Sequence, residues 1–483
     1  MSFRLKPIAL FSLLIPLSLT YNVSYAQNTT LQILSDSEMS DVNGQALMSL
    51  AYIAPTDSEN LMNKYSANSN VGFYKLGLEA DLDINTNIKN LQLGCGGGNG
   101  AGKCDLDIKN LSLSGLPTSY DSTGNAVFAD GRASTSAKLT NPFMEFAIKN
   151  PDSASLREVV GLRLSAEKIT GLLTSGLVNG LVPSSTDGIQ NLSGFMRIAA
   201  TSGTAKTLPA VFGKQSNHQI RGLLNAIGAD REFTSDPSSE DTLGITIPEL
   251  NATFNIPEFQ VNGSRLESAK ISGIKSKIDS ISLSDGPLNQ LKVTFPAIAL
   301  VANKAKIELK EGSAVKNLNL DISFDQALSM IHNIPLTGNG GYLSLQQQSI
   351  LWPGSYISAN DVSALELSKM TQSDVAQRGW WMSFADPVQL GTLNATQKVN
   401  VNDVLPQVAT LMTTELLKEE NRVKAPFFAS IGTLFGITMT TPKPIIIDLN
   451  AATLANPAKL ALSNLNLGNQ EVRANCYGSL KFC

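Results

Sequence analysis

Histidine is almost absent from this chain of 483 residues, which contains only His218 and His332. A histidine general base or a histidine-rich metal centre needs more of this residue gathered at one point of the fold. Charged residues make up only 16% of the chain and the formal net charge is −4, so no basic excess can meet nucleic-acid phosphates. We therefore expect a protein that is not an enzyme, with no catalytic residues, metal ligands or cofactor and no nucleic-acid partner.

Long apolar runs are missing beyond the N-terminus. The nearest one, Ala425–Met439, is interrupted by Pro426 and by three hydroxyl residues. It therefore falls short of the roughly 18 apolar residues expected of a membrane helix. Aromatic residues make up only 6% of the chain, which is few for the girdles of an outer-membrane barrel. Tyr477 and Phe482 in the last segment keep such a barrel as a less favoured alternative.

The first 26 residues have the pattern of a secretory signal peptide. Arg4 and Lys6 form a positive start, Ile8–Leu19 is a short apolar stretch, and Ser24-Tyr25-Ala26 is a small-x-small cleavage site. We expect cleavage between Ala26 and Gln27, which removes two positive charges and takes the net charge from −4 to −6. The pattern predicts an exported protein, located in the periplasm, the outer membrane or on the cell surface of a Gram-negative bacterium.

The four cysteines fall into two close pairs, Cys95 with Cys104 and Cys476 with Cys483. Three pairings are possible, and the local one is favoured because its partners are close along the chain. Each small loop would add roughly 2.5 kcal/mol of stability in the chain-entropy treatment. A zinc site is the alternative, but the spacing matches no CxxC pattern. The sequence predicts two disulfides, which persist in an oxidising compartment.

Residues 27–70 are expected to contain a short helix and a polar linker. The helix lies within Leu34–Gln45, which begins with capping residues, has acidic residues in its first turn and ends at Gly44. Met39 and Val42 form its apolar side. A short amphipathic helix near a free end can dock on another protein, so Met39, Val42 and Gly44 are candidate partner-binding positions. Residues 57–70 are polar and read as a linker.

From about Val71 onward, apolar and polar residues alternate, as is typical of half-buried strands. Ile88–Gly94, Asp105–Gly115 and Lys316–Ile322 carry related phrases, which predict similar β units stacked or lying side by side. The expected fold class is mainly β, with amphipathic strands in an extended or curled sheet or a sandwich, and a few short helices. We expect β-rich regions at 71–228 and 245–483, joined by an acidic linker at 229–244.

Two helices are expected within these regions. His218–Ile227 places its apolar residues three and four apart, which favours one face of a helix. Asp403 can cap a longer helix over 404–422, whose apolar stripe favours packing against the core.

Two patterns resemble ligand sites, although each has a simpler explanation. Gly97–Cys104 nearly matches a phosphate-binding P-loop, but Cys104 replaces the required hydroxyl and a strand phrase follows instead of a helix. The simpler interpretation is a glycine-rich hairpin loop closed by a disulfide. Asp81, Asp83 and Asn85 alternate and could share one strand face, where their oxygens could bind calcium, but a solvated strand face is the expectation.

Trp380 and Trp381 are adjacent, and such a pair can form a binding platform for a sugar or a partner. More often one ring of such a pair is buried and the other lies along a groove. Both residues are therefore candidate partner-binding positions.

The segment Leu34–Gln45 resembles the L-S-D-x-E-[ML]-S-x-V-x-G-Q segment found after the signal peptide of many exported proteins of Acinetobacter-like bacteria. Residues 136–151, continuing through Arg157–Gly161, are similar to pilus-assembly proteins of the Fil type (FilA-like). The resemblance implies a surface or periplasmic role in a filament system. It supplies no catalytic residues.

The leading expectation is an exported structural or assembly protein of a bacterial pilus or surface filament, acting on other envelope proteins through sheet edges and apolar strand faces. The alternative is an envelope lipid-binding protein, because amphipathic strands can curl into an apolar groove. A continuous apolar trough open to solvent would favour lipid binding, and a closed core would favour the scaffold.

Overall fold

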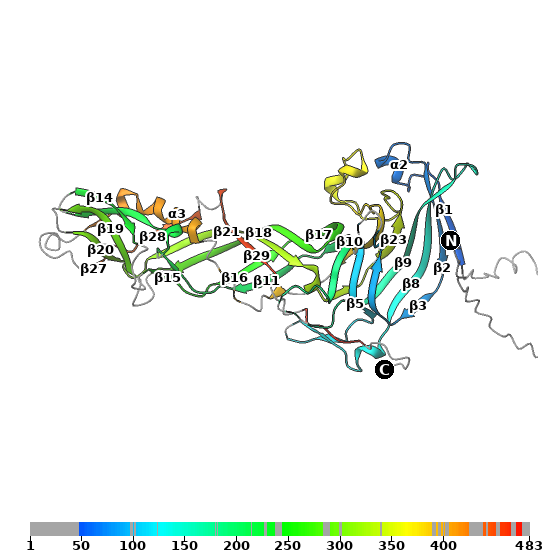
Figure 1. The fold of residues 1–483 in the computed structure, drawn as a ribbon, viewed down its shortest axis with the longest axis horizontal. Helices are drawn as coiled ribbons and strands as arrows, with labels where there is room; N and C mark the ends of the chain where they lie inside the picture. The colour runs from blue at the N-terminus through cyan, green and yellow to red at the C-terminus, as the bar shows by residue number, and fades with distance from the viewer. Residues whose placement is uncertain are drawn as a thin grey trace, which may run out of the picture. The chain divides into compact units, whose positions relative to one another are not determined.

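The computed structural model describes most of residues 48–475. The residues inside this span that it does not describe are 97–99, 101–102, 123, 179, 181, 214, 227–228, 237–243, 284–289, 299–301, 339–340, 389–392, 395–397, 399, 401–404, 425–437, 441–442, 451–454 and 465–469. The described chain is mainly β, as the alternating pattern predicted, with few helices (Figure 1). No helix within the described residues is long and apolar enough to cross a membrane.

The largest sheet has twelve strands, drawn from both halves of the chain. Its main path runs β1-β2-β8-β9-β23-β24-β10-β5-β4, with β3, β17 and β22 attached at its sides. The path strands are β1 (Met48–Ile53), β2 (Val71–Leu78), β8 (Ala137–Lys149), β9 (Glu158–Thr174), β23 (Gly341–Gln346), β24 (Gly379–Val388), β10 (Gly188–Ile198), β5 (Leu106–Ser114) and β4 (Thr86–Leu93). The side strands are β3 (Asp81–Ile84), β17 (Phe259–Leu266) and β22 (Asn333–Leu336).

Part of this sheet closes on itself. The end of β9 also pairs with the end of β5, where Leu173 lies opposite Leu113. The strands β9, β23, β24, β10 and β5 therefore form a closed ring, and β8, β2 and β1 extend the sheet outward from β9. Figure 1 shows β1, β2, β8 and β9 side by side in this extension.

The two faces of this sheet carry different cores. One face is covered by Met62 and Tyr65 of α2 (Met62–Tyr65) and by the segment between β23 and β24, which contributes the fully buried Trp352. The other face contributes a second cluster around Leu106, Leu173 and other strand residues that the ring encloses. The polar stretch 57–70, expected to be a linker, therefore supplies two core side chains through α2.

A further part of the chain builds two sheets around one apolar cluster. The first contains β26 (Val423–Lys424), β13 (Arg221–Ala226), β14 (Ala229–Ser235), β19 (Gln290–Ile298), β20 (Ala302–Glu308) and β27 (Thr438–Thr440). The second contains β18 (Ser268–Ser282), β21 (Ala314–Ala327), β28 (Ile446–Asp448) and β29 (Ala458–Ser463). The helix α3 (Leu405–Leu416) packs its apolar side into the same cluster, as predicted for residues 404–422.

The remaining described strands make small sheets. These are β16 (Asn251–Ile256), β11 (Thr201–Lys206) and β25 (Leu393–Asn394) together, β12 (Ala210–Phe212) with β15 (Ile245–Ile247), and β6 (Ser119–Tyr120) with β7 (Ala126–Val127). Short 3-10 turns lie at Arg132–Ser134, Ser216–His218, Leu328–Met330, Ala359–Asp361, Leu367–Lys369 and Glu419–Asn421.

The predicted helix over His218–Ile227 is wrong. The described part of this segment is a 3-10 turn at Ser216–His218 followed by strand β13, which pairs with β14. Ile220, Gly222 and Leu224 are buried at every second position, and two of them also fit a helical spacing of four. The pattern therefore fits a strand as well as a helix, and the pairing of β13 with β14 stabilises the strand.

The expected linker at 229–244 does not separate two groups of strands. Its first residues form β14, which pairs with β13 and β19. Residues 237–243 lie outside the described part. In addition, β17, β22, β23 and β24 come from the expected second region, and they pair with β9 and β10 of the first.

Candidate functional site

An unbroken row of apolar side chains crosses six strands of the large sheet. Leu50 lies opposite Leu76, Leu76 opposite Met144, and Met144 opposite Leu164. The row continues from Leu164 to Leu343 and from Leu343 to Met382. Directly opposite residues in neighbouring strands project from the same face, so all six side chains share one face of the sheet.

A second row lies two residues further along each strand and therefore projects from the same face. It consists of directly paired residues, mostly aromatic: Tyr52, Tyr74, Phe146, Leu162, Leu345 and Trp380. The rings of Tyr52 and Tyr74 are stacked with their centroids 4.3 Å apart. The two rows together make one face of the extension continuously apolar.

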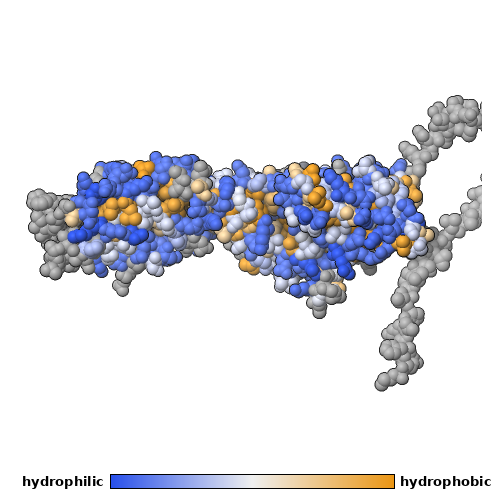
Figure 2. All heavy atoms as spheres, turned by 90° about the horizontal axis from the view of Figure 1, so that it is seen from above, coloured by the Kyte–Doolittle hydropathy of each residue, from blue (hydrophilic) through white to orange (hydrophobic). Residues whose placement is uncertain are grey.

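This face is open to solvent over much of its area. In the first row Leu50 is 77% exposed and Leu164 is 44% exposed, although both are aliphatic. Leu76 and Met144 between them are also exposed. Soluble proteins seldom leave adjacent aliphatic side chains open in this way unless the surface binds something. Figure 2 shows hydrophobic residues reaching the surface in patches between hydrophilic ones.

Apart from Leu50, the residues of the first row line a groove of about 590 Å³. The lining residues are Met48, Leu76, Gly77, Leu78, Leu113, Leu139, Pro142, Phe143, Met144, Leu164, Ser165, Ile169, Leu173, Leu336, Gly341, Tyr342, Leu343, Met382 and Phe384. They come from β1 and β2 at one end and from the ring strands β5, β9 and β24 at the other. The groove therefore runs from the open extension toward the interior of the ring.

The chemistry of the groove is set by what lines it. None of its lining residues carries a charge, and Ser165 and Tyr342 are the only ones with a polar side-chain group. Both residues neighbour a first-row residue along their strands, so their side chains alternate away from the open face. Both hydroxyls have partners: Ser165 donates to the carbonyl of Gly341 and Tyr342 donates to Asp374. The groove can therefore hold apolar chains by burial, but it offers no ion pair and no acid–base pair for chemistry.

The opposite face of the same strands holds a buried polar cluster around Asp374. The fully buried Asp374 carboxylate accepts hydrogen bonds from the Tyr342 hydroxyl (2.9 Å), the Trp381 ring N–H (3.1 Å) and the Ser383 hydroxyl (2.6 Å). Burial outweighs these three donors and raises the pKa of Asp374 from 3.8 to about 6. The cluster fastens the segment between β23 and β24 to the sheet.

A buried ion pair lies beside this cluster. The Arg163 guanidinium contacts the Glu145 carboxylate, with both side chains almost fully buried. Arg163 also lies over the rings of Tyr342 (5.4 Å) and Trp352 (5.2 Å). Burial raises the pKa of Glu145, and the attraction of Arg163 works against that rise. Because the covering segment shields this face, the pair belongs to the fold.

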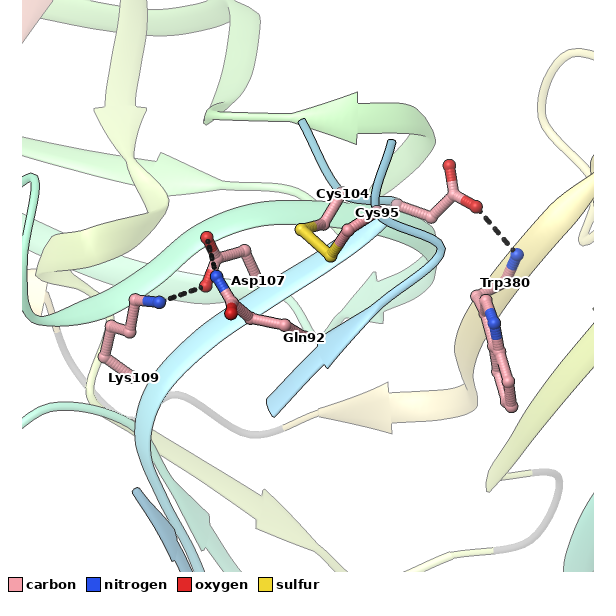
Figure 3. The surroundings of a disulfide bond; sticks show 7 residues. Gln92, Cys95, Cys104, Asp107, Lys109 and Trp380 are labelled. Atoms are coloured by element: carbon pink, nitrogen blue, oxygen red, sulfur yellow. Dashed lines mark hydrogen bonds and ion pairs between the residues drawn. A yellow bond between two sulfur atoms is a disulfide. The ribbon is translucent and has the colours of Figure 1, made fainter. Parts of the chain in front are cut away.

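The two adjacent tryptophans lie on opposite faces of β24. Trp381 is 1% exposed and belongs to the covered core, whereas the half-buried Trp380 stands in the second apolar row of the open face. The backbone N–H of Trp380 donates to Asp105 at 3.1 Å, and Figure 3 shows this contact beside the Cys95–Cys104 bond. Only Trp380 is therefore placed to contact a ligand on the open face.

The Cys95–Cys104 disulfide is present, as predicted, and it closes the hairpin between β4 and β5. Next to it Asp107 accepts from Gln92 and pairs with Lys109 (Figure 3). Most of the glycine-rich P-loop-like stretch between the two cysteines lies outside the described residues.

Asp81, the first of the residues that could have bound calcium, has other partners. Asp81 pairs with Lys138 at 3.1 Å and accepts a hydrogen bond from Thr140. These bonds lower the pKa of Asp81, with Thr140 the larger cause. No group of three or more metal-ligating side chains occurs within the described residues.

Several predicted positions lie outside the described residues. These are the cleavage site Ala26 and Gln27, the candidate partner-binding residues Met39, Val42 and Gly44, and the cysteines Cys476 and Cys483. Their roles and pairing stay predictions.

The groove residues themselves were not singled out in the sequence. Leu76, Met144 and Leu164 look like ordinary inward-facing strand residues, because alternation does not tell a covered face from an open one. The signal that could have drawn attention to them is alternation without an obvious covering helix nearby in the chain. No protein-family model, curated protein or solved structure matches this chain.

Proposed function

We propose that the protein is an exported envelope protein that binds a lipid by taking its apolar chain into the groove. The observation that carries the proposal is a continuous apolar trough that opens to solvent and has no charged lining residue. Its volume of about 590 Å³ lies within the roughly 300–1,000 Å³ typical of small-molecule sites. The lipid head group would stay outside, because the lining offers it no partner.

Chain length is the sharpest test of this proposal. Each methylene buried in an apolar site contributes about 0.8 kcal/mol, so each added methylene should tighten binding about fourfold. This gain should stop once the chain fills the groove. Saturated fatty acids of increasing length would be titrated into the mature protein by displacement of a fluorescent fatty acid. Affinity that rises and then levels off supports the groove, and affinity that does not depend on length contradicts it.

A charge placed in the groove tests its location. Leu164→Glu puts a carboxylate in the middle of the first row, where an apolar chain would leave it unpaired. Leu365→Glu is the matched control, because Leu365 is 78% exposed and does not line the groove. We expect Leu164→Glu to weaken fatty-acid binding at least about tenfold and Leu365→Glu to leave it unchanged. Equal effects of the two variants would place binding elsewhere.

The filament-assembly role implied by the resemblance is the second candidate. The observation that favours it is the exposed apolar surface that continues onto β1, the strand at one end of the sheet path. The test is deletion of the gene, combined with cell fractionation and electron microscopy of surface filaments. Normal filaments after deletion would remove this candidate and leave lipid binding untouched.

A further inference from the structure

Strand β1 ends the large sheet with one edge unpaired among the described residues. It pairs with β2 along all six of its residues, and no described strand lies on its other side. The backbone N–H and C=O groups of such an edge are a template for another extended strand. The occupant that fits this edge is therefore a strand.

The edge has none of the usual protection against pairing. Natural edge strands carry charged side chains, a proline or a bulge. The sequence of β1 is Met-Ser-Leu-Ala-Tyr-Ile, without charge or proline, and its pairing with β2 has no register shift. Three of its large side chains are open to solvent: Met48 is 57% exposed, Leu50 77% and Tyr52 41%. An edge strand that lacks charge, proline and bulge and exposes apolar side chains is expected to pair with a partner strand.

The strand is complementary to an inverted copy of itself. Residues 48–52 alternate large and small in either direction, with Leu50 at the centre. In an antiparallel pair centred on Leu50, Leu50 meets Leu50 and Met48 meets Tyr52, while Ser49 meets Ala51. All contacts are apolar or small, no like charges meet, and the open apolar face continues from one copy to the next. We propose that β1 pairs antiparallel with β1 of a second copy of this chain about a two-fold axis.

The size of this contact sets its strength. Two strands of six residues bury less than the roughly 1,200 Å² of standard stable interfaces. The dimer should therefore be weak, with a dissociation constant in the micromolar range. It does not require a ligand in the groove, so this inference and lipid binding can fail independently.

Cysteine trapping at the symmetry centre tests the contact. Opposite residues in an antiparallel pair have Cα atoms roughly 4.5–5.5 Å apart, which is within disulfide range. Leu50→Cys should therefore form an intermolecular disulfide under mild oxidation. Leu365→Cys is the matched control, since Leu365 is equally exposed but lies on the segment between β23 and β24. We expect cross-linked dimer for Leu50→Cys at least about tenfold above the control.

Sedimentation completes the test without cross-linking. The mature protein should shift from monomer to dimer as its concentration rises through the micromolar range, and Leu50→Lys should abolish the shift because two ammonium groups would meet. A thermal melt confirms that the variant folds. A monomer at all concentrations, or equal cross-linking of both cysteine variants, would overturn the proposal. A wild-type monomer that binds phosphatidylcholine vesicles through Leu50 would also overturn it, in favour of a membrane contact.

Discussion

Replacing Asp374 by Asn should remove a defined part of the pH dependence of stability. Asp374 is fully buried, and its pKa is raised from 3.8 to about 6, chiefly by burial. Between these two values the folded protein keeps a proton that the unfolded chain releases. The unfolded state therefore binds fewer protons, and the free energy of unfolding falls as pH rises through this window.

The magnitude follows from the same two values. At about 1.4 kcal/mol for each tenfold change in the ionisation constant, the rise from 3.8 to about 6 amounts to ~3 kcal/mol. This stability is fully present below pH 3.8 and is lost once the pH passes about 6. Asp374→Asn keeps a neutral acceptor for Tyr342 and Trp381, and the Ser383 hydroxyl can accept from the new amide. The free energy of unfolding of the variant should therefore lack the ~3 kcal/mol fall that Asp374 causes as pH rises from 3.8 to about 6.

The assay is urea unfolding at several pH values between 3.5 and 7.5, followed by tryptophan fluorescence, because Trp352 and Trp381 are both buried near the cluster. The quantity of interest is the wild-type free energy of unfolding minus that of Asp374→Asn. We expect this difference to fall by ~3 kcal/mol across the window, whereas other titrating groups cancel. Parallel curves for the two proteins would refute the reasoning.

Three further outcomes are expected. Arg163→Met should lower the free energy of unfolding by about 3–5 kcal/mol, because it leaves Glu145 buried without its counter-ion, and adding Glu145→Leu should restore most of the loss in the same denaturant titration. Replacing Cys95 and Cys104 by Ser should cost about 2.5 kcal/mol by denaturant unfolding, and non-reducing peptide mapping of the native chain should recover this pair intact. Deleting Leu34–Gln45 should leave the thermal melt unchanged, because the short helix expected there has only Met39 and Val42 on its apolar side, whereas export or filament assembly, measured by fractionation and electron microscopy, should be lost. A collapsed melt would show that this segment belongs to the core.

The sequence allowed prediction of the elements whose signals are local. The alternation in residues 88–94 and 105–115 identified β4 and β5, and their closeness along the chain favoured the Cys95–Cys104 bond. The apolar stripe after residue 404 identified α3.

The groove could not be predicted in the same way, because it depends on pairings between distant strands. Leu164 of β9 meets Leu343 of β23, far along the chain, and no local pattern encodes that register. The first row is exposed because no other described segment packs over it, and the alternation of apolar and polar residues carries no information about such covering. The prediction of a helix at 218–227 was wrong for a related reason, because the strand β13 found there depends on its pairing with β14.

The closure of the ring also bears on how the chain acquires its structure. The strand β10 ends at Ile198, but its parallel neighbour β24 begins only at Gly379. During synthesis, the facing edges of β9 and β10 therefore stay without their neighbours until more than a hundred further residues have been made and β23 and β24 are available. Contacts of such separation slow folding and leave strand edges exposed in the meantime. Fragments that stop before residue 341 should thus aggregate rather than fold, and assistance from a chaperone is of most use in that interval.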